Sequence, residues 1–258
     1  MRLEIELFMD YAIESCDPAL LAITAAHTDG QTVLESALEI ENATLRWMDG
    51  EGKLGQRVWA ATEGEQLKLR YRAKVDVTRP EVALQNLAAT PWHALPGEVL
   101  TFLRPSRFCP SDLFAAFVSK QFGHLEGGEK IAAILAWTAA SLGYAPGSST
   151  ATTTAIDTFV AREGVCRDYA HLVCSMARAA NIPARYTTGY GADVNPPDFH
   201  AVAEVWLDGA WHLVDATGMS SAAGLVVIGS GRDAGDVAFM ETEKWANPIR
   251  QRINVSRA

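Results

Sequence analysis

Three side chains in the second half of the chain could together form an activated thiol nucleophile. Cys166 begins a stretch with helical periodicity, and His200 and Asp215 follow it in chain order. The thiolate is the nucleophilic form of cysteine, and a histidine can take the thiol proton. A carboxylate can orient the imidazole and stabilise its charged form. This set of residues predicts acyl transfer through a thioester.

An amphipathic helix is expected to begin at Cys166. Its apolar residues recur at helical spacing: Tyr169, Leu172, Val173, Met176, Ala177 and Ala180. Cys166 extends this stripe, so we expect its thiol to face the core, and Asn181 and Pro183 should end the helix. A helix N-terminus carries roughly half a positive charge, which favours a thiolate there. Gly164 allows close approach of the backbone, and the N–H of Cys166 could donate to an oxyanion.

The register of a predicted hairpin decides whether the other two side chains can meet. Asp208-Gly209 favours a two-residue type I′ turn, which places Asp215 opposite Val202. His200 and Asp215 then share a face at a diagonal separation of roughly 7–8 Å, which a carboxylate–imidazole hydrogen bond can span. The other face is apolar: Ala201, Ala203, Val205, Leu207, Val214 and Ala216. A three-residue loop without a bulge would place the two side chains on opposite faces.

Other titratable residues fit the site less well. His212 lies on the wrong face of the hairpin, and His171 lies about 140° around the helix from Cys166. Asp168 is expected to stabilise the first helical turn. Glu204 shares the face of His200 and could be a second carboxylate, although a solvated position or one at the substrate rim is favoured. We expect the isolated histidines to be structural: His27, His93 and His124. No H-E-x-x-H motif or Cys/His cluster suggests zinc, and no cofactor is expected.

Two domains are expected from the changing pattern along the chain. Residues 1 to about 80 alternate at period two between turn signals, which predicts a β-sandwich. The expected strands are 3–9, 32–40, 57–61 and 66–78. An irregular, proline-containing connection follows, and from residue 111 the pattern turns helical. The expected later elements are helices over 113–122, 129–142 and 154–162 and strands over 185–190, 200–207 and 211–217. We predict a β-sandwich over 1–100 and an α+β catalytic domain over 101–258.

Composition indicates an ordinary globular protein with no nucleic-acid partner. The apolar fraction is 48% and the net charge is −9, whereas nucleic-acid binders usually present a basic face. No basic segment followed by an apolar one suggests a secretory leader, and no apolar run approaches the roughly 18 residues that span a membrane. The cysteines are far apart without disulfide spacing: Cys16, Cys109, Cys166 and Cys174. We therefore expect free thiols and a cytoplasmic location.

Several segments together resemble the bacterial transglutaminase-like superfamily. They are Gly164-Val165-Cys166-Arg167-Asp168-Tyr169-Ala170-His171-Leu172, Ile182-Pro183-Ala184-Arg185-Tyr186 with Gly189-Tyr190, His200-Ala201 with Glu204-Val205, Asp215-Ala216-Thr217, residues 105–112 and residues 231–237. The first hundred residues are similar to a β-rich domain of one bacterial branch. The resemblance implies a papain-like core of helices packed on an antiparallel sheet, with the triad Cys166, His200 and Asp215. Tyr144 falls where some relatives place an aromatic near the site. Val202 replaces a frequent tryptophan, the hairpin loop is short, and nothing resembles the calcium sites of animal transglutaminases.

The resemblance leaves the reaction open, because such families include cross-linking enzymes, proteases, deamidases and inactive scaffolds. We favour a cysteine-type hydrolase or acyltransferase that acts on peptide or isopeptide bonds of a polypeptide or peptide substrate. Hydrolysis is favoured over protein-glutamine γ-glutamyltransferase cross-linking, because the sequence reveals no water-excluding channel for an acceptor. Acetyl transfer to small arylamines uses the same triad, but its surrounding motif is absent. A non-catalytic binding or assembly module is the remaining alternative. The sandwich is expected to dock against the catalytic core and shape access to it.

Overall fold

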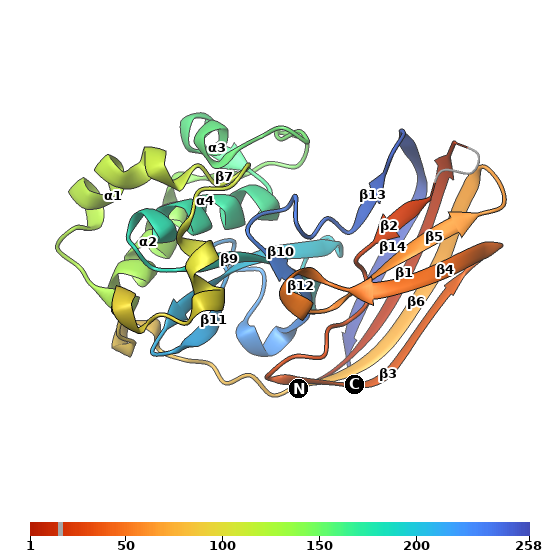
Figure 1. Ribbon diagram of the computed structural model, residues 1–258, viewed down its shortest axis with the longest axis horizontal. Coiled ribbons are helices and arrows are strands. Elements are labelled where there is room, and N and C mark those ends of the chain that lie inside the picture. Colours follow the sequence, from red (N-terminus) through yellow and green to blue (C-terminus); the bar gives the residue numbers. More distant parts are fainter. Residues whose placement is uncertain (15–17) are drawn as a thin grey trace.

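A helical part and a part made of strands alone lie side by side (Figure 1). The computed structural model describes residues 1–14 and 18–258. Cys16 lies outside the described residues. The other three cysteines are free thiols, as predicted.

The strand-only part is a sandwich of two four-stranded antiparallel sheets, which confirms the predicted β-sandwich. The first sheet, in the order β14-β1-β6-β3, contains β1 (Arg2–Ile13), β3 (Gln31–Ile40), β6 (Gln66–Val77) and β14 (Ala246–Arg257). The second, in the order β13-β2-β5-β4, contains β2 (Ala19–Leu21), β4 (Ala43–Asp49), β5 (Gln56–Thr62) and β13 (Met240–Thr242). Side chains of β1 are alternately exposed and buried, so the period-two pattern places one face in the core between the sheets.

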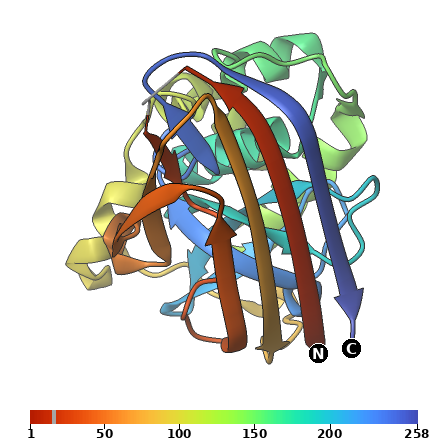
Figure 2. The ribbon, with the colours of Figure 1, turned by 90° about the vertical axis from the view of Figure 1, so that its right-hand side faces the viewer.

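The last strand of the chain corrects one expectation about the domains. Residues 246–257 were assigned to the catalytic domain, but β14 pairs with β1 along almost its whole length, from Leu3 opposite Arg257 to Ile13 opposite Ala246. Both ends of the chain therefore meet at one end of this sheet (Figure 2). The strand was missed because Ile253 is its single buried residue, which leaves no alternation to detect. The boundary between residues 100 and 101 stays a prediction.

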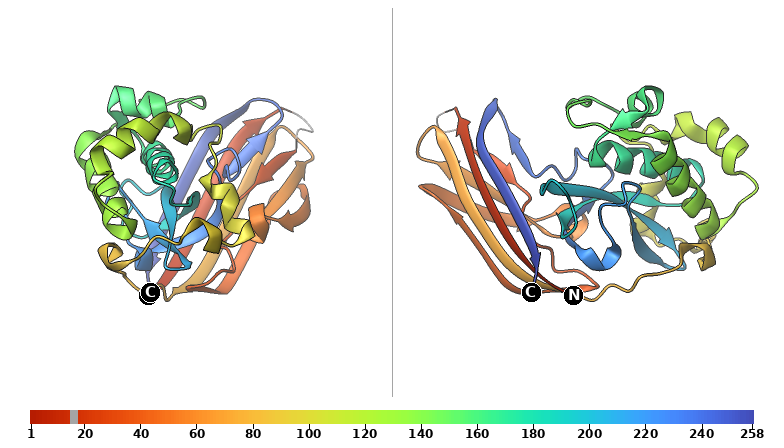
Figure 3. Two further views of the ribbon diagram at one scale, coloured as in Figure 1. Left: turned by 60° about the vertical axis from the view of Figure 1, so that its left-hand side comes forward. Right: turned by 180° about the vertical axis from the view of Figure 1, so that it is seen from behind.

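The second part packs helices against an antiparallel sheet, as predicted (Figures 1 and 3). The helices are α1 (Ala115–Phe122), α2 (Gly127–Ser141), α3 (Ala155–Ala161) and α4 (Cys166–Ala179). The sheet, in the order β11-β10-β9-β12, contains β9 (Ala184–Gly191), β10 (Phe199–Leu207), β11 (Ala210–Val214) and β12 (Leu225–Gly231). A separate parallel pair is formed by β7 (Gly143–Tyr144) and β8 (Glu163–Gly164). Short 3-10 turns occupy 51–53, 84–86, 92–94, 97–103, 111–114 and 222–224. None of the described helices combines the length and apolar character needed to cross a membrane.

The sandwich docks directly on the sheet of the helical part. The ring of Tyr190 on β9 stacks on Tyr71 of β6 with centroids 6.3 Å apart, and its hydroxyl donates to the carbonyl of Ile23 at 2.6 Å. Gln31 donates to the carbonyl of Val227 on β12 at 2.9 Å. Because these groups are buried, the contact is a continuous core rather than a flexible linkage.

Candidate active site

Cys166 is the first residue of α4. It is half-buried and packs against the helical core, so the expectation that it extends the buried stripe holds in part. The carboxylate of Asp168 accepts hydrogen bonds from the backbone N–H of Val165 at 2.9 Å and from Arg167 at 3.1 Å. Asp168 therefore fastens the first turn of the helix, as expected, and the thiol stays at a helix N-terminus, where an anion is favoured.

The hairpin has the register that the sequence predicts. Leu207 lies opposite Ala210, and φ is positive at both Asp208 (48°) and Gly209 (75°), as a type I′ turn requires. The apolar face of the hairpin packs in the same core as α4. β11 ends at Val214, so Asp215 lies just past the last paired residue.

This register brings His200 and Asp215 into direct contact. Nε2 of His200 lies 2.7 Å from Oδ2 of Asp215, and both side chains are almost fully buried. Oδ1 of Asp215 accepts from the backbone N–H of Thr217 at 2.8 Å and from its hydroxyl at 2.7 Å. Oδ2 also accepts from the N–H of Ser220 at 3.0 Å. A carboxylate held by four hydrogen bonds has one orientation, and that orientation in turn fixes the imidazole.

The bonds from Thr217 and Ser220 to Asp215 were not predicted from the sequence. A threonine two residues after an aspartate at a strand end is a usual turn pattern, and this could have indicated the bond from Thr217. The bond from Ser220 depends on how the following loop folds back, for which no local signal exists.

The imidazole of His200 also interacts with Cys166. Burial lowers the pKa of His200, but hydrogen bonds with Asp215 and Cys166, together with their charges, outweigh burial and raise it to about 9. Nδ1 is buried and has no hydrogen-bond partner among the described residues, whereas Nε2 contacts Asp215, so Nδ1 is the ring nitrogen left for the thiol. We therefore expect His200 to be protonated at neutral pH, next to a sulfur at a helix N-terminus.

Tyr144 reaches the same point from another element. Pairing of β7 with β8 places Tyr144 opposite Gly164, close to the start of α4. Burial and the neighbouring Cys166 thiol raise the pKa of Tyr144 to about 12, while a hydrogen bond with the backbone of Cys166 lowers it. Tyr144 is thus a neighbour of Cys166 at the N-terminus of α4, where an oxyanion would form.

If Cys166 performs the acyl transfer that the sequence predicts, removing the Tyr144 hydroxyl is expected to slow the chemical step. Tyr144→Phe should lower kcat by about 100-fold with little change in KM, because an oxyanion donor acts mainly in the transition state. Tyr169→Phe is the matched control, since its hydroxyl donates to the carbonyl of Leu142 at 2.9 Å instead. Steady-state kinetics on one amide substrate measures both. A higher kcat for Tyr144→Phe would mean that the hydroxyl blocks the site.

Glu204 does not lie in solvent or at a substrate rim, so that expectation was wrong. The side chain is buried, and its carboxylate pairs with Arg185 at 2.5 Å. It also accepts hydrogen bonds from the hydroxyls of Thr187 at 2.7 Å and Ser230 at 3.0 Å. Burial raises the pKa of Glu204, but the charge of Arg185 and these hydrogen bonds outweigh it and hold the pKa below its usual value. Glu204 therefore acts as a buried structural charge between β9, β10 and β12.

Two of the histidines that the sequence set aside, His171 and His212, make structural contacts. His171 is fully buried, its Nε2 accepts from the N–H of Ala234 at 3.1 Å, and its ring stacks on Phe108. Burial, with the charges of nearby arginines, lowers its pKa well below the usual value. His212 contacts the carbonyl of Leu207 at 3.1 Å. Across residues 1–14 and 18–258, no group of three His, Cys, Asp or Glu side chains converges as a metal site.

Two segments noted in the sequence, 105–112 and 231–237, meet beside α4. Asp233 accepts from the N–H of Phe108 at 2.9 Å. Arg178, near the end of α4, donates to Ser106 at 3.1 Å and to the carbonyl of Arg232. These contacts anchor the C-terminal end of α4, the helix that has Cys166 at its N-terminal end.

Comparison with known proteins identifies the family. A model of the transglutaminase-like superfamily matches residues 116–216, which include Cys166, His200 and Asp215. A crystal structure of a candidate cysteine protease from Cytophaga hutchinsonii is 34% identical, with a TM-score of 0.92. The similarity covers 99% of this chain and 90% of that one. The chain belongs to the transglutaminase-like superfamily.

Similarity to curated proteins covers only part of each chain. This transglutaminase-like chain is 29% identical to an uncharacterized protein of Mycobacterium leprae, over 53% of this chain and 52% of that protein. It is 33% identical to an uncharacterized protein of Mycobacterium tuberculosis, over 44% of this chain and 41% of that protein. The chain thus spans about half the length of the curated relatives it matches, or less.

Proposed function

We propose that this protein is a thiol-dependent amide hydrolase or acyltransferase that acts on peptide or isopeptide bonds of polypeptides. The observation that carries the proposal is the buried 2.7 Å contact between His200 and Asp215 beside a half-buried cysteine at a helix N-terminus. Membership of the family and the similarity to a candidate cysteine protease support it.

The first half of the reaction forms a thioester. The sulfur of Cys166 attacks the carbonyl carbon of the amide, and the oxygen that becomes negative accepts hydrogen bonds from the N–H of Cys166 and the hydroxyl of Tyr144. His200 gives its proton to the leaving amine or ammonia as the carbon–nitrogen bond breaks. Asp215 stabilises the charged imidazole and keeps Nδ1 directed at the sulfur.

The second half resolves the thioester. His200, now neutral, takes a proton from water or from a second amine, which attacks the same carbon. The Cys166 sulfur then leaves, and the resting state is restored. We favour water as the acceptor, so that the products are those of a protease or deamidase. Cross-linking would require an acceptor amine to replace water at this step.

A peptide-library assay scored in parallel for ammonia release, chain cleavage and amine incorporation tests the reaction class. Cleavage or ammonia release that is lost in Cys166→Ala and kept in Cys174→Ala would support the hydrolase. Dominant amine incorporation would instead identify a cross-linking transferase. The polypeptide substrate and the cytoplasmic location stay predictions.

Alkylation by iodoacetamide tests whether the thiol is activated at all. In a Cys16→Ser background Cys166 is expected to be labelled selectively, because Cys109 and Cys174 are fully buried. Burial alone would produce that selectivity, so the pH dependence is the decisive measurement. Labelling of an ordinary thiol slows about tenfold per pH unit below its pKa of about 8.5, whereas labelling of an ion-paired thiolate stays nearly constant below pH 7. A profile like that of an ordinary thiol would favour a non-catalytic binding or assembly module.

A further inference from the structure

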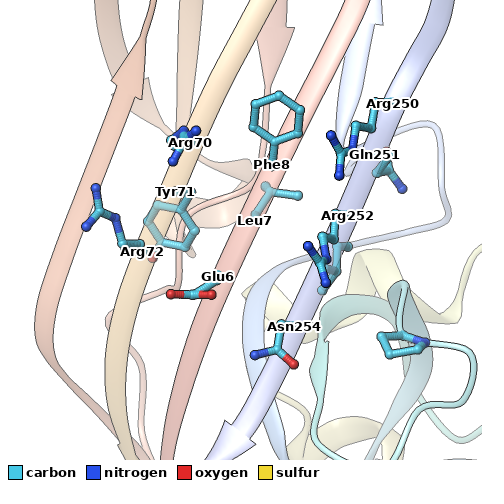
Figure 4. Close-up of a pocket in the computed structure, with 12 residues that line it drawn as sticks. Glu6, Leu7, Phe8, Arg70, Tyr71, Arg72, Arg250, Gln251, Arg252 and Asn254 are labelled. Carbon is cyan, nitrogen blue, oxygen red and sulfur yellow. The ribbon is translucent and has the colours of Figure 1, made fainter.

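A groove of about 810 Å³ lies on the outer face of the sheet β14-β1-β6-β3, and none of the residues that line it belongs to the site around Cys166 (Figure 4). It is lined by residues 6–8 of β1, 70–72 of β6 and 250–254 of β14, and Phe8 is one of them. Pro197, from the loop that leads into β10, closes one side.

The basic side chains of this face fall into two sets. One set is neutralised by glutamates of neighbouring segments: Lys68 by Glu41, Arg72 by Glu39, and Lys74 by Glu4 and Glu35. Arg70, Arg250 and Arg252 form the other set, and none of them makes an ion pair with a described carboxylate. Three uncompensated guanidinium groups in one groove are unexpected in a chain with a net charge of −9.

Two of these arginines lie over the ring of Phe8, and the third, Arg252, lies opposite Phe8 on the neighbouring strand. The guanidinium carbons of Arg70 and Arg250 lie 5.6 Å and 5.8 Å from the centre of its ring. Register places Phe8 opposite Arg70 on β6 and opposite Arg252 on β14. Figure 4 shows the side chains of Arg250 and Arg252 extending from β14 toward β1, with Arg70 on the other side of Phe8.

Acidic residues of the sheet do not cancel this charge. Asp10 lies opposite Arg250 in register, but its carboxylate accepts a hydrogen bond from Gln66 at 2.6 Å and makes no ion pair with that arginine. Glu6 lines the opposite end of the groove, near Asn254. The groove is therefore basic around Phe8 and of mixed polarity at its other end.

We propose that this groove binds an acidic stretch of polypeptide. The planar guanidinium group of arginine forms paired hydrogen bonds with carboxylates. The ring of Phe8 provides an apolar surface between the guanidinium groups for the backbone of the bound peptide. An open groove that crosses three strands suits an extended chain better than a small anion, which would need convergent donors in an enclosed site. The acidic residues at its margins disfavour the uniformly charged backbone of a nucleic acid.

The bound segment would lie beside the loop that leads into β10, the strand that contains His200. Gln251 of β14 donates to Asp198 at 2.9 Å and accepts from the hydroxyl of Tyr11 at 2.9 Å, so the loop is fastened to the sheet next to the groove. His200 follows two positions after Asp198. The proposal itself does not depend on the proposed function, since binding is measured without turnover.

Fluorescence anisotropy with a labelled hexaglutamate peptide tests the proposal on the full chain. We expect saturable binding that weakens as sodium chloride rises from about 50 to 200 mM, and that is at least about tenfold weaker in the triple variant Arg70→Ala/Arg250→Ala/Arg252→Ala. Lys68→Ala is the matched control, because this lysine lies on the same strand, does not line the groove and pairs with Glu41, and it should change affinity less than about twofold. Labelled hexalysine should not bind.

Three results would overturn the proposal. The peptide could fail to bind at concentrations up to about 1 mM, or bind the triple variant as well as the parent protein. Alternatively, sedimentation could show self-association that only the triple variant loses, with no peptide binding, which would make a second copy the occupant. All three arginines are exposed, so the variant should keep its thermal unfolding temperature.

Discussion

Replacing His200 by alanine is expected to lower kcat/KM for an amide substrate by about 10³- to 10⁴-fold. In the proposed mechanism the imidazole holds the proton that the leaving amine requires; it lies 2.7 Å from Asp215, and the neighbouring Cys166 helps to raise its pKa. Initial rates on the best library peptide measure the effect. The exposed His124→Ala is the matched control and should keep full activity.

The pH dependence separates this role from a merely structural one. Because the pKa of His200 is raised to about 9, activity should fall as pH rises through about 9 and the proton is lost. A raised pKa also stabilises the fold below the usual value of about 6.5, and this contribution is lost between there and about 9. Both dependences should be absent in His200→Ala. A variant that folds, retains activity and keeps the alkaline limb would disprove the mechanism.

Replacing Glu204 by leucine is expected to destabilise the fold by about 3–5 kcal/mol, the cost of leaving a buried charge without its partner. Arg185 is mostly buried, lies over the ring of Trp211 and depends on Glu204 for its counter-charge. Denaturant unfolding followed by tryptophan fluorescence measures the change.

The double variant Glu204→Leu/Arg185→Met is the control, and it should recover most of the lost stability because neither charge remains buried. The free energies of the four proteins in this cycle give the coupling between the two side chains directly. If Glu204→Leu unfolds at the same denaturant concentration as the parent protein, Glu204 is not a structural charge.

The local features of the candidate site could be predicted because their causes are local. The start of α4 at Cys166 follows from residues three and four apart along one helix, and the hairpin register follows from Asp208-Gly209. The alternation of β1 likewise predicted one face of the sandwich. The catalytic roles of Cys166, His200 and Asp215 stay predictions until the variants are measured.

Amino-acid order alone thus determined which side chains could meet at the thiol, since helical periodicity and turn chemistry act over a few residues. Only the tertiary structure decided the pairing of β14 with β1, the burial of Glu204 and the approach of Arg70 and Arg250 to the ring of Phe8. Each of these depends on segments far apart in the chain, whose contact is selected by the packing of the whole molecule and not by the local pattern of either segment.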